Sequence, residues 1–457
     1  MLRDVNEDDL GAAVGRTWRK LSASFWFLPT LPTVTALVIA PVLVQFDERL
    51  QAAGRSIAWL EWIYGGGLQG ARRLLSAIAA AMMAISTVMF SSQTTALTFI
   101  GQEYGSRLLR NFLADTRNQL AFGTYISTFI YALMVLRTIH KDPDDAPVPH
   151  LAVSFGIILA MAGLGVLIYS MYHISRFLQA STIIGYAAKD LDNAIVRLTR
   201  EKTARRPGEA FAGDDARASS AFDFIGVPIV AESTGYLQRV KASRLVRLCR
   251  NAGCRIRIDR KIGDFIIAGT AVGVIAERAP IDADLLTQIR RAIVLGPQPN
   301  IDEDLRHAAN QLVQIALRAA STDRNDSLTA GMCIDRMGAA LCLMARRTPP
   351  ESIMCDPDGA PRLKLESVHL SDVLDVCSRP LREYREATPS LVAHMLTMLR
   401  AVADCAERAE DRRALRREAM LVAEPGSEQR GAGPAGRERI ARTYEDLCRA
   451  LDTFPRD

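Results

Sequence analysis

Four long stretches without a single Asp, Glu, Lys or Arg constrain this chain more than any other feature of its sequence. They cover residues 21–46, 74–102, 118–136 and 146–175. The hydrocarbon core of a bilayer needs about 20 apolar helical residues, and backbone groups in lipid must be satisfied within the segment. One such stretch could be buried in a soluble core, but four in succession predict four transmembrane helices.

Charged residues are divided unevenly along the 457-residue chain. Residues 1–180 hold 26 of them, about 14%, whereas the following 277 residues hold 81, about 29%. Soluble domains average roughly 25%. The expected fold class is therefore a membrane α-helical part with four transmembrane helices, followed by a cytoplasmic α+β and helical region. This excludes a uniform soluble globule, a disordered chain and a disulfide-stapled mini-domain.

The lysines and arginines near the spans predict the orientation. Eleven lie on one side, at Arg3, Arg16, Arg19, Lys20, Arg107, Arg110, Arg117, Arg176, Lys189, Arg197 and Arg200, and six on the other, at Arg49, Arg55, Arg72, Arg73, Arg137 and Lys141. The positive-inside rule then places both termini in the cytoplasm. All eight cysteines follow the spans, so they are expected to be reduced cytosolic thiols.

Six parts are expected along the chain. They are a cytoplasmic N-terminal segment (1–20), a four-helix transmembrane domain (21–180), a connecting helix and linker (181–235), a small barrel-like basic α+β module (236–280), a mainly helical cytoplasmic domain (281–422) and a mobile tail with a short helix (423–457). Alternation of Cys254, Ile256 and Ile258 with charged residues predicts a strand in the basic module. Asp356–Gly359 reads as a β-turn, and Asp326 or Ser327 as a helix N-cap.

The second span carries a stripe of hydroxyls. Thr87, Ser91, Thr94 and Thr98 fall at i, i+4, i+7 and i+11, which is one face of a helix. Such a face could line a water-filled path and replace part of an ion's hydration shell. Alternatively, the hydroxyls bond back to carbonyls four residues earlier or join neighbouring helices. The spans hold no deep ionisable residue, which argues against a proton relay.

A basic run follows the spans. Its members are Arg239, Lys241, Arg244, Arg247, Arg250, Arg255, Arg257, Arg260 and Lys261, and Asp259 is the only acid among them. Near a membrane the first seven are candidates for binding anionic lipid headgroups, and a solvated face without a partner is the alternative. Nucleic acid is not expected, because the run has almost no aromatic residues on which bases could stack.

Enzyme signatures are missing from the sequence. It has no P-loop, dinucleotide glycine motif, His-Glu-x-x-His or Gly-x-Ser-x-Gly. Cys249 and Cys254 lack a second ligand pair at zinc spacing, and His173 is expected to be an interfacial histidine without a role. No catalytic residue, metal or cofactor is therefore predicted.

Several segments resemble a known family. They are 21–29 (LSASFWFLP), Phe90-Ser91 with Ala96-Leu97, 106–109 (SRLL), Gly263-Asp264-Phe265 with Gly269, 311–319 (QLVQIALRA) and 325–330 (NDSLTA). In order and spacing these are similar to the bacterial predicted membrane proteins grouped as domain of unknown function 2254. The resemblance implies a multi-pass protein of the bacterial inner membrane and carries no activity with it. Ser106, Thr322 and Ser327 stand where this family usually has proline.

Two functional hypotheses follow from these observations. The first is an oligomeric channel or passive transport protein, lined by the second span and gated by the cytoplasmic region. The alternative is a membrane-anchored sensor or scaffold, in which the basic module binds anionic lipid or a protein partner. The expected partners are thus the lipid bilayer, anionic headgroups and further copies of the chain.

Overall fold

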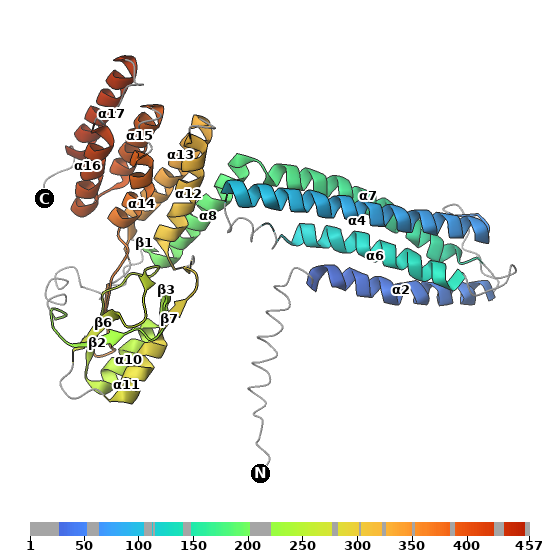
Figure 1. The fold of residues 1–457 in the computed structure, drawn as a ribbon, viewed down its shortest axis with the longest axis horizontal. Coiled ribbons are helices and arrows are strands. Elements are labelled where there is room, and N and C mark those ends of the chain that lie inside the picture. Colours follow the sequence, from blue (N-terminus) through green and yellow to red (C-terminus); the bar gives the residue numbers. More distant parts are fainter. Residues whose placement is uncertain are drawn as a thin grey trace, which may run out of the picture. The chain divides into compact units, whose positions relative to one another are not determined.

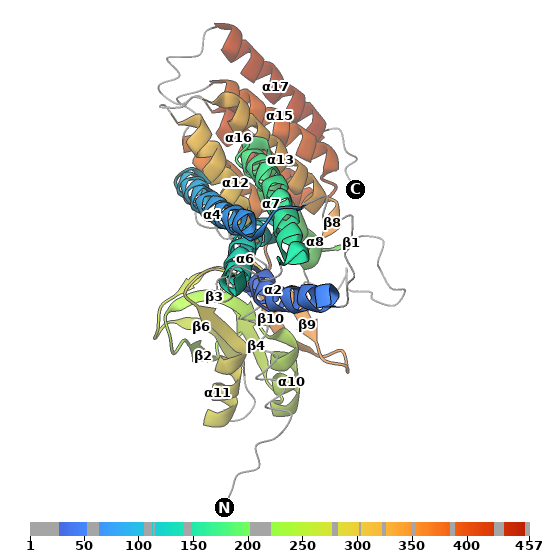
Figure 2. The same ribbon diagram turned by 90° about the vertical axis from the view of Figure 1, so that its right-hand side faces the viewer.

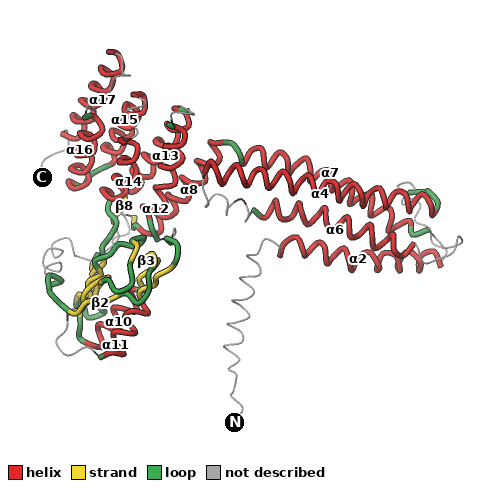
Figure 3. The backbone as a smooth tube through the Cα atoms, in the orientation of Figure 1, coloured by secondary structure: helices red, strands yellow, loops and turns green. Residues whose placement is uncertain are grey.

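The computed structural model describes residues 27–52, 64–104, 112, 115–139, 148–201, 221–276, 282–300, 303–321, 326–349, 352–383, 389–424 and 434–452. The chain forms two compact units, Met1–Gln179 and Ala180–Asp457. Among the described residues, the first unit contains long helices and the strands belong to the second (Figure 3). Each unit is described by itself below.

Four long helices make up the first unit (Figure 1). They are α2 (Phe27–Ala52), α4 (Leu68–Tyr104), α6 (Thr116–Ile139) and α7 (His150–Phe177). Each overlaps one of the four uncharged stretches, so the sequence located these helices correctly. α2 and α4 extend further along the chain than the stretches do, because helical hydrogen bonding continues into the charged residues that flank the apolar core. Residues 21–26 of the first stretch lie outside the described residues.

Helix α6 is the centre of this unit. It packs against α2, α4 and α7, and it lies between α2 and α4 (Figures 1 and 2). Gly123 permits its close approach to α2, since a Cβ there would lie 2.8 Å from Pro32 Cγ and 2.9 Å from Pro29 Cα. Real Cβ atoms do not come this near to another heavy atom, so the packing depends on a residue without a side chain at this position.

The count of four spans is not confirmed, because five helices are long and apolar enough to cross a bilayer. The fifth is α13 (Ser327–Ala345), whose hydropathy maximum is the lowest of the five. It is also the most enclosed: 56% of its apolar window is buried, compared with 22–44% for the others. Length and apolar composition alone do not separate a membrane helix from one buried in a helical domain.

Two sheets occupy one end of the second unit (Figure 1). The larger has the order β2 (Val227–Val230), β6 (Ala271–Ala276), β4 (Arg255–Ile258), β10 (Pro361–Leu365) and β9 (Ile353–Cys355), and the smaller has the order β5 (Phe265–Ile266), β3 (Gly235–Val240) and β7 (Ile293–Gly296). Only β4 and β10 pair in parallel; the other pairs are antiparallel. The sheets therefore draw strands from well beyond the 236–280 module expected from the sequence.

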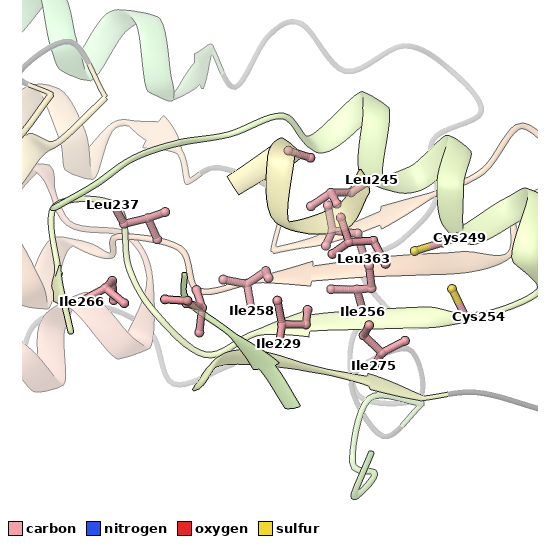
Figure 4. Close-up of a cluster of buried hydrophobic side chains, with 14 residues drawn as sticks. Ile229, Leu237, Leu245, Cys249, Cys254, Ile256, Ile258, Ile266, Ile275 and Leu363 are labelled. Atoms are coloured by element: carbon pink, nitrogen blue, oxygen red, sulfur yellow. The ribbon is translucent and has the colours of Figure 1, made fainter. Parts of the chain in front are cut away.

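The core of this sheet region lies beneath two short helices. α10 (Ala242–Ala252) and α11 (Ala283–Ala292) lie side by side (Figure 2), α10 against β4, β9 and β10 of the larger sheet and α11 against β7 of the smaller one. Ile256 and Ile258 of β4 point into the cluster with Leu363 of β10 (Figure 4). The alternation in the sequence predicted both the strand and its buried face correctly. Fully burying one such isoleucine contributes about 1.5–3 kcal/mol.

Helices form the rest of the second unit. They are α8 (Ala180–Leu198), α12 (Leu305–Ala320), α13, α14 (Leu370–Glu383), α15 (Pro389–Cys405), α16 (Ala409–Ala423) and α17 (Pro434–Asp452). α13 packs against α8, α12, α14 and α15. Asp326 caps α13 by accepting from Thr329 N at 3.0 Å, as the sequence predicted. A two-residue ladder between β1 (Arg200–Glu201) and β8 (Arg347–Thr348) joins the ends of α8 and α13.

Gly263 joins the sheets to the helices through a tight contact. Its φ of 93° lies in the left-handed region, and a Cβ there would overlap the carboxylate of Asp304. Asp304 is buried and caps α12 by accepting from Arg306 N at 3.0 Å. Burial raises the pKa of this carboxyl, against the opposing effects of the cap and the Arg306 charge. The glycine is thus required both by its conformation and by the approach of a helix cap.

Gly263→Ala should lower the free energy of unfolding by more than about 2 kcal/mol. Left-handed strain alone costs roughly 1–2 kcal/mol, and displacement of the Asp304 cap adds to it. Gly269→Ala is the matched control, because its φ is 86° and nothing lies within 4 Å of its Cβ position. The measurement is chemical unfolding of the full chain in detergent, followed by circular dichroism. Equal losses of unfolding free energy in the two variants would contradict a steric conflict between a side chain at position 263 and Asp304.

Candidate functional site

The hydroxyl stripe of Thr87, Ser91, Thr94 and Thr98 lies on an exposed face of α4. Three of its members bond back to their own helix: Thr87 donates to Met83 O at 3.0 Å, Thr94 to Phe90 O at 2.9 Å, and Thr98 to Thr94 O at 3.0 Å. For these three residues the structure shows the alternative given above, in which the hydroxyls bond back to carbonyls four residues earlier; each hydroxyl donates its proton in this bond and keeps lone pairs that can accept.

The opposite face of α4 packs inside the unit. It is formed by Leu75, Ile78, Ala79, Met82, Ser86, Met89, Gln93, Ala96 and Ile100, all of them buried. The stripe therefore points away from α6 and α7, and no described helix of the first unit covers it. Towards the start of α4 the exposed face continues with the small residues Ser76, Ala80 and Ala84. Small residues on an outer face allow a second helix to approach closely.

A second set of polar residues lies inside the unit, and sequence reasoning missed it as a set. Its members are Ser86 and Gln93 of α4, Asn118, Gln119, Ser127 and Thr128 of α6, and Ser154 and Ser170 of α7. Gln93 Nε2 and Asn118 Nδ2 have no hydrogen-bond partner within the part of the chain that the structure describes. The spacing of Ser86 and Gln93, seven residues apart, could have indicated a polar face on the side of α4 opposite the stripe.

Ionisable side chains lie near the ends of the long helices of the first unit. His173 Nε2 lies 2.6 Å from Asp115 Oδ2, which ties the last turns of α7 to the start of α6. Near the other end of the unit, the buried Asp47 of α2 accepts from Leu151 N of α7 at 2.8 Å. His173 therefore has a defined partner, a role that its isolated position in the sequence did not indicate. The Asp47 carboxylate lies at the N-terminus of α7, where the helix dipole favours a negative charge.

Ion pairs and carbonyls engage four of the seven lipid-binding candidates. Arg239 pairs with Glu303, and Arg250 pairs with Asp358 at 2.9 Å. Arg255 donates to Ala221 O and Arg257 to Phe222 O, each at 2.6 Å, and both guanidinium groups lie over the ring of Phe224. Arginines held in this way are parts of the fold as well as sources of charge.

Lys241, Arg244 and Arg247 make up the remainder of these candidates. All three are exposed, at the start of α10 and on its outer face, and form no ion pair with any described residue. Arg291 on the neighbouring α11 is exposed as well. Four exposed positive charges that form no ion pair with a described residue therefore lie on these two neighbouring helices.

The carboxylate of Asp356 has a structural role. Asp356 closes the β9–β10 hairpin, accepting from Ala360 N at 2.9 Å and from the Arg362 guanidinium at 2.8 Å. That arginine and the turn N–H groups hold the pKa of the Asp356 carboxyl below its usual value. Among the described residues no cluster of His, Cys, Asp or Glu is arranged to hold a metal ion, and the eight cysteines are free thiols.

Comparison with known proteins settles the family. Residues 22–401 match the family described as "Predicted membrane protein (DUF2254)". The chain belongs to this family. The resemblance found in the sequence motifs is thereby confirmed, and the protein is a predicted membrane protein with several apolar helices that could cross a bilayer.

Relatives exist in mycobacteria. An uncharacterized protein of Mycobacterium tuberculosis (strain ATCC 25618 / H37Rv) and one of Mycobacterium bovis are each 27% identical to this chain over 389 residues. The match covers 84% of this chain and 72% of each relative. No solved structure matches the chain.

Asp372 supplies a pH-dependent contact between the sheets and the helices. Its carboxylate pairs with Lys261 at 2.7 Å and accepts from His369 N at 2.9 Å. Burial alone would raise the pKa of Asp372, but the lysine and the N–H outweigh it and the pKa is lowered. Because the folded state holds the charged form, its contribution is present above the ordinary carboxyl pKa and is lost as the pH falls below it.

Asp372→Asn should therefore destabilise the protein by about 1–3 kcal/mol near neutral pH. The difference from the unchanged protein should stay constant down to about pH 5 and shrink as the pH falls through the ordinary Asp pKa of about 3.9 towards the lower pKa of the folded state. Asp375→Asn is the control, because the ion pair of Asp375 with Arg379 is exposed and local. Unfolding midpoints in detergent at several pH values would test this, and a difference that stays constant with pH would contradict it.

Proposed function

We propose that this protein is an oligomeric channel or passive transport protein of the bacterial inner membrane, in which α4 lines the path. The single observation that carries the proposal is the hydroxyl stripe on the face of α4 that the described helices of the first unit leave uncovered. A stripe facing lipid would present oxygens to a medium that cannot hydrate them. A second copy of the chain placed against α4 would enclose the stripe instead.

The topology that goes with this proposal has four spans, α2, α4, α6 and α7, with both termini in the cytoplasm. Enclosure of α13 by α8, α12, α14 and α15 supports leaving it out of the membrane. Eleven flanking basic residues against six favour the cytoplasmic placement of the termini. On this topology the second unit is cytoplasmic and is the part that gates the path.

Acceptor chemistry favours a small cation or water as the permeant species. Because Thr87, Thr94 and Thr98 donate their protons to carbonyls of α4, their outward oxygens offer lone pairs. Lone pairs of this kind can replace water molecules around a cation. The small residues Ser76, Ala80 and Ala84 would let neighbouring copies of α4 meet along the rest of the same face. No catalytic step is part of this proposal.

The leucine variant Thr87→Leu/Ser91→Leu/Thr94→Leu should abolish potassium flux through liposomes that hold the purified protein. Leucine removes the acceptors and narrows the proposed path, and helix propensity is kept or improved. Val88→Leu/Phe99→Leu is the control, since both positions are exposed on α4 but lie off the stripe.

Size-exclusion profiles and circular dichroism would show that both variants are folded. Flux that survives in the leucine variant would contradict the assignment of α4 as the lining helix. Absence of flux in the unchanged protein, tested with several ions and small solutes, would contradict the channel itself.

A second candidate function, a membrane-anchored sensor or scaffold, rests on a different observation. Lys241, Arg244 and Arg247 form an exposed positive surface with no ion pair to any described residue. Surfaces of this kind attract anionic phospholipid headgroups, with about 1 kcal/mol contributed by each charge near the bilayer.

Arg244→Glu/Arg247→Glu should weaken binding of an anionic phospholipid to the full chain in detergent by at least about tenfold. Arg413→Glu/Arg417→Glu on α16 is the matched control, because these arginines are also exposed, belong to one helix and form no ion pair with a described residue. Native mass spectrometry would count the bound lipids. Equal lipid binding by both variants and the unchanged protein would count decisively against the scaffold.

A further inference from the structure

Two thiols from different helices meet at the surface of the helical region. Cys342 lies in the last turns of α13, and Cys405 is the last residue of α15. The two thiol groups lie close enough to interact electrostatically. Cys342 Sγ also donates to the carbonyl of Ala401, one turn before Cys405, at 3.5 Å. Both cysteines are partly exposed, so the pair can be reached from solvent.

An arginine completes this arrangement. Arg346, one turn after Cys342, donates from Nη2 to Cys405 Sγ at 3.3 Å. Reactive cysteines are typically found beside a cation in partly exposed surroundings, and Arg346 supplies that cation. The adjacent acid, Asp404, forms an ion pair with Arg400. Burial raises the pKa of Cys342 to about 12, so this cysteine keeps its proton.

We infer that Cys342 and Cys405 form a peroxide-sensitive modification site, at which oxidation by hydrogen peroxide joins α13 to α15 by a disulfide. Cys405 thiolate attacks one peroxide oxygen, the O–O bond breaks, and the products are Cys405 sulfenic acid and hydroxide. Cys342 sulfur then attacks the sulfenic sulfur, the S–O bond breaks, and that oxygen leaves as water with the Cys342 proton. Two thiols are oxidised by two electrons, and one peroxide is reduced to two waters.

Four other cysteines are buried and lack access to solvent. Cys249 and Cys254 lie close together inside the hydrophobic cluster (Figure 4), where they are 0% and 3% exposed. Cys333 and Cys377 are buried, and burial raises the pKa of each to about 12. The buried pair therefore serves as an internal control for proximity without access.

The test is peptide mapping of the full chain in detergent after treatment with hydrogen peroxide, with free thiols blocked before digestion. The expected result is a Cys342–Cys405 cross-linked peptide in most molecules, while Cys249 and Cys254 stay reduced. In the variant Cys342→Ser the sulfenic acid on Cys405 should persist and react with dimedone. Arg346→Met should slow formation of the cross-link several-fold, and Arg336→Met, an exposed arginine on the same helix, should leave the rate unchanged.

Three results would overturn the inference. One is Cys405 oxidised to sulfinic acid without a cross-link, and another is Cys405 left reduced. The third is a Cys249–Cys254 cross-link that forms as fast as the proposed one, which would show that proximity alone governs the reaction. Circular dichroism of the treated and untreated protein would show whether unfolding exposed the buried thiols.

Discussion

Helix α6 carries Asn118, Gln119, Ser127 and Thr128 on faces that it buries against its neighbours. Its mean hydropathy over the apolar window is 1.5, the lowest of the four long helices in the first unit. A polar helix in a bilayer is stabilised when protein covers it, and α2, α4 and α7 provide that cover. Since α6 separates α2 from α4, the outer faces of both remain free, and the exposed position of the stripe on α4 follows from this arrangement.

Charge and hydropathy along the chain predicted the four long helices because lipid imposes a rule that is local in sequence. About 20 uncharged residues in succession identify such a helix without any knowledge of its neighbours. The inner face of α4 was not predicted, because both of its faces carry polar residues. Ser86 and Gln93 are buried, whereas Ser91 and Thr94 are exposed. Contact with α6 and α7 determines which of the two polar faces is buried, and the polar residues of α4 alone do not distinguish them.

Contacts between distant segments were even harder to predict from the sequence in the second unit. Alternation predicted β4 and its buried isoleucines, but the strand beside it, β10, comes from a hairpin about one hundred residues further along the chain. Parallel pairing of distant segments leaves no local signature. The ion pairs of the basic run could not be predicted for the same reason. The acidic partners, Glu303, Asp358 and Asp372, lie far away in sequence. The sequence locates the basic residues along the chain, while the structure was needed to separate the arginines that hold the fold from those that form no ion pair with a described residue.

Chain connectivity places the start of the second unit directly after the end of the first, because α7 ends at Phe177 and α8 begins at Ala180. Ile183, Leu191 and Ile195 bury α8 against α12 and α13, and close-packed interiors transmit strain rather than absorb it. α13 also carries Cys342, whose thiol lies against α15 one turn before Cys405. A covalent bond between α13 and α15 would therefore stiffen the packing on which α8 rests.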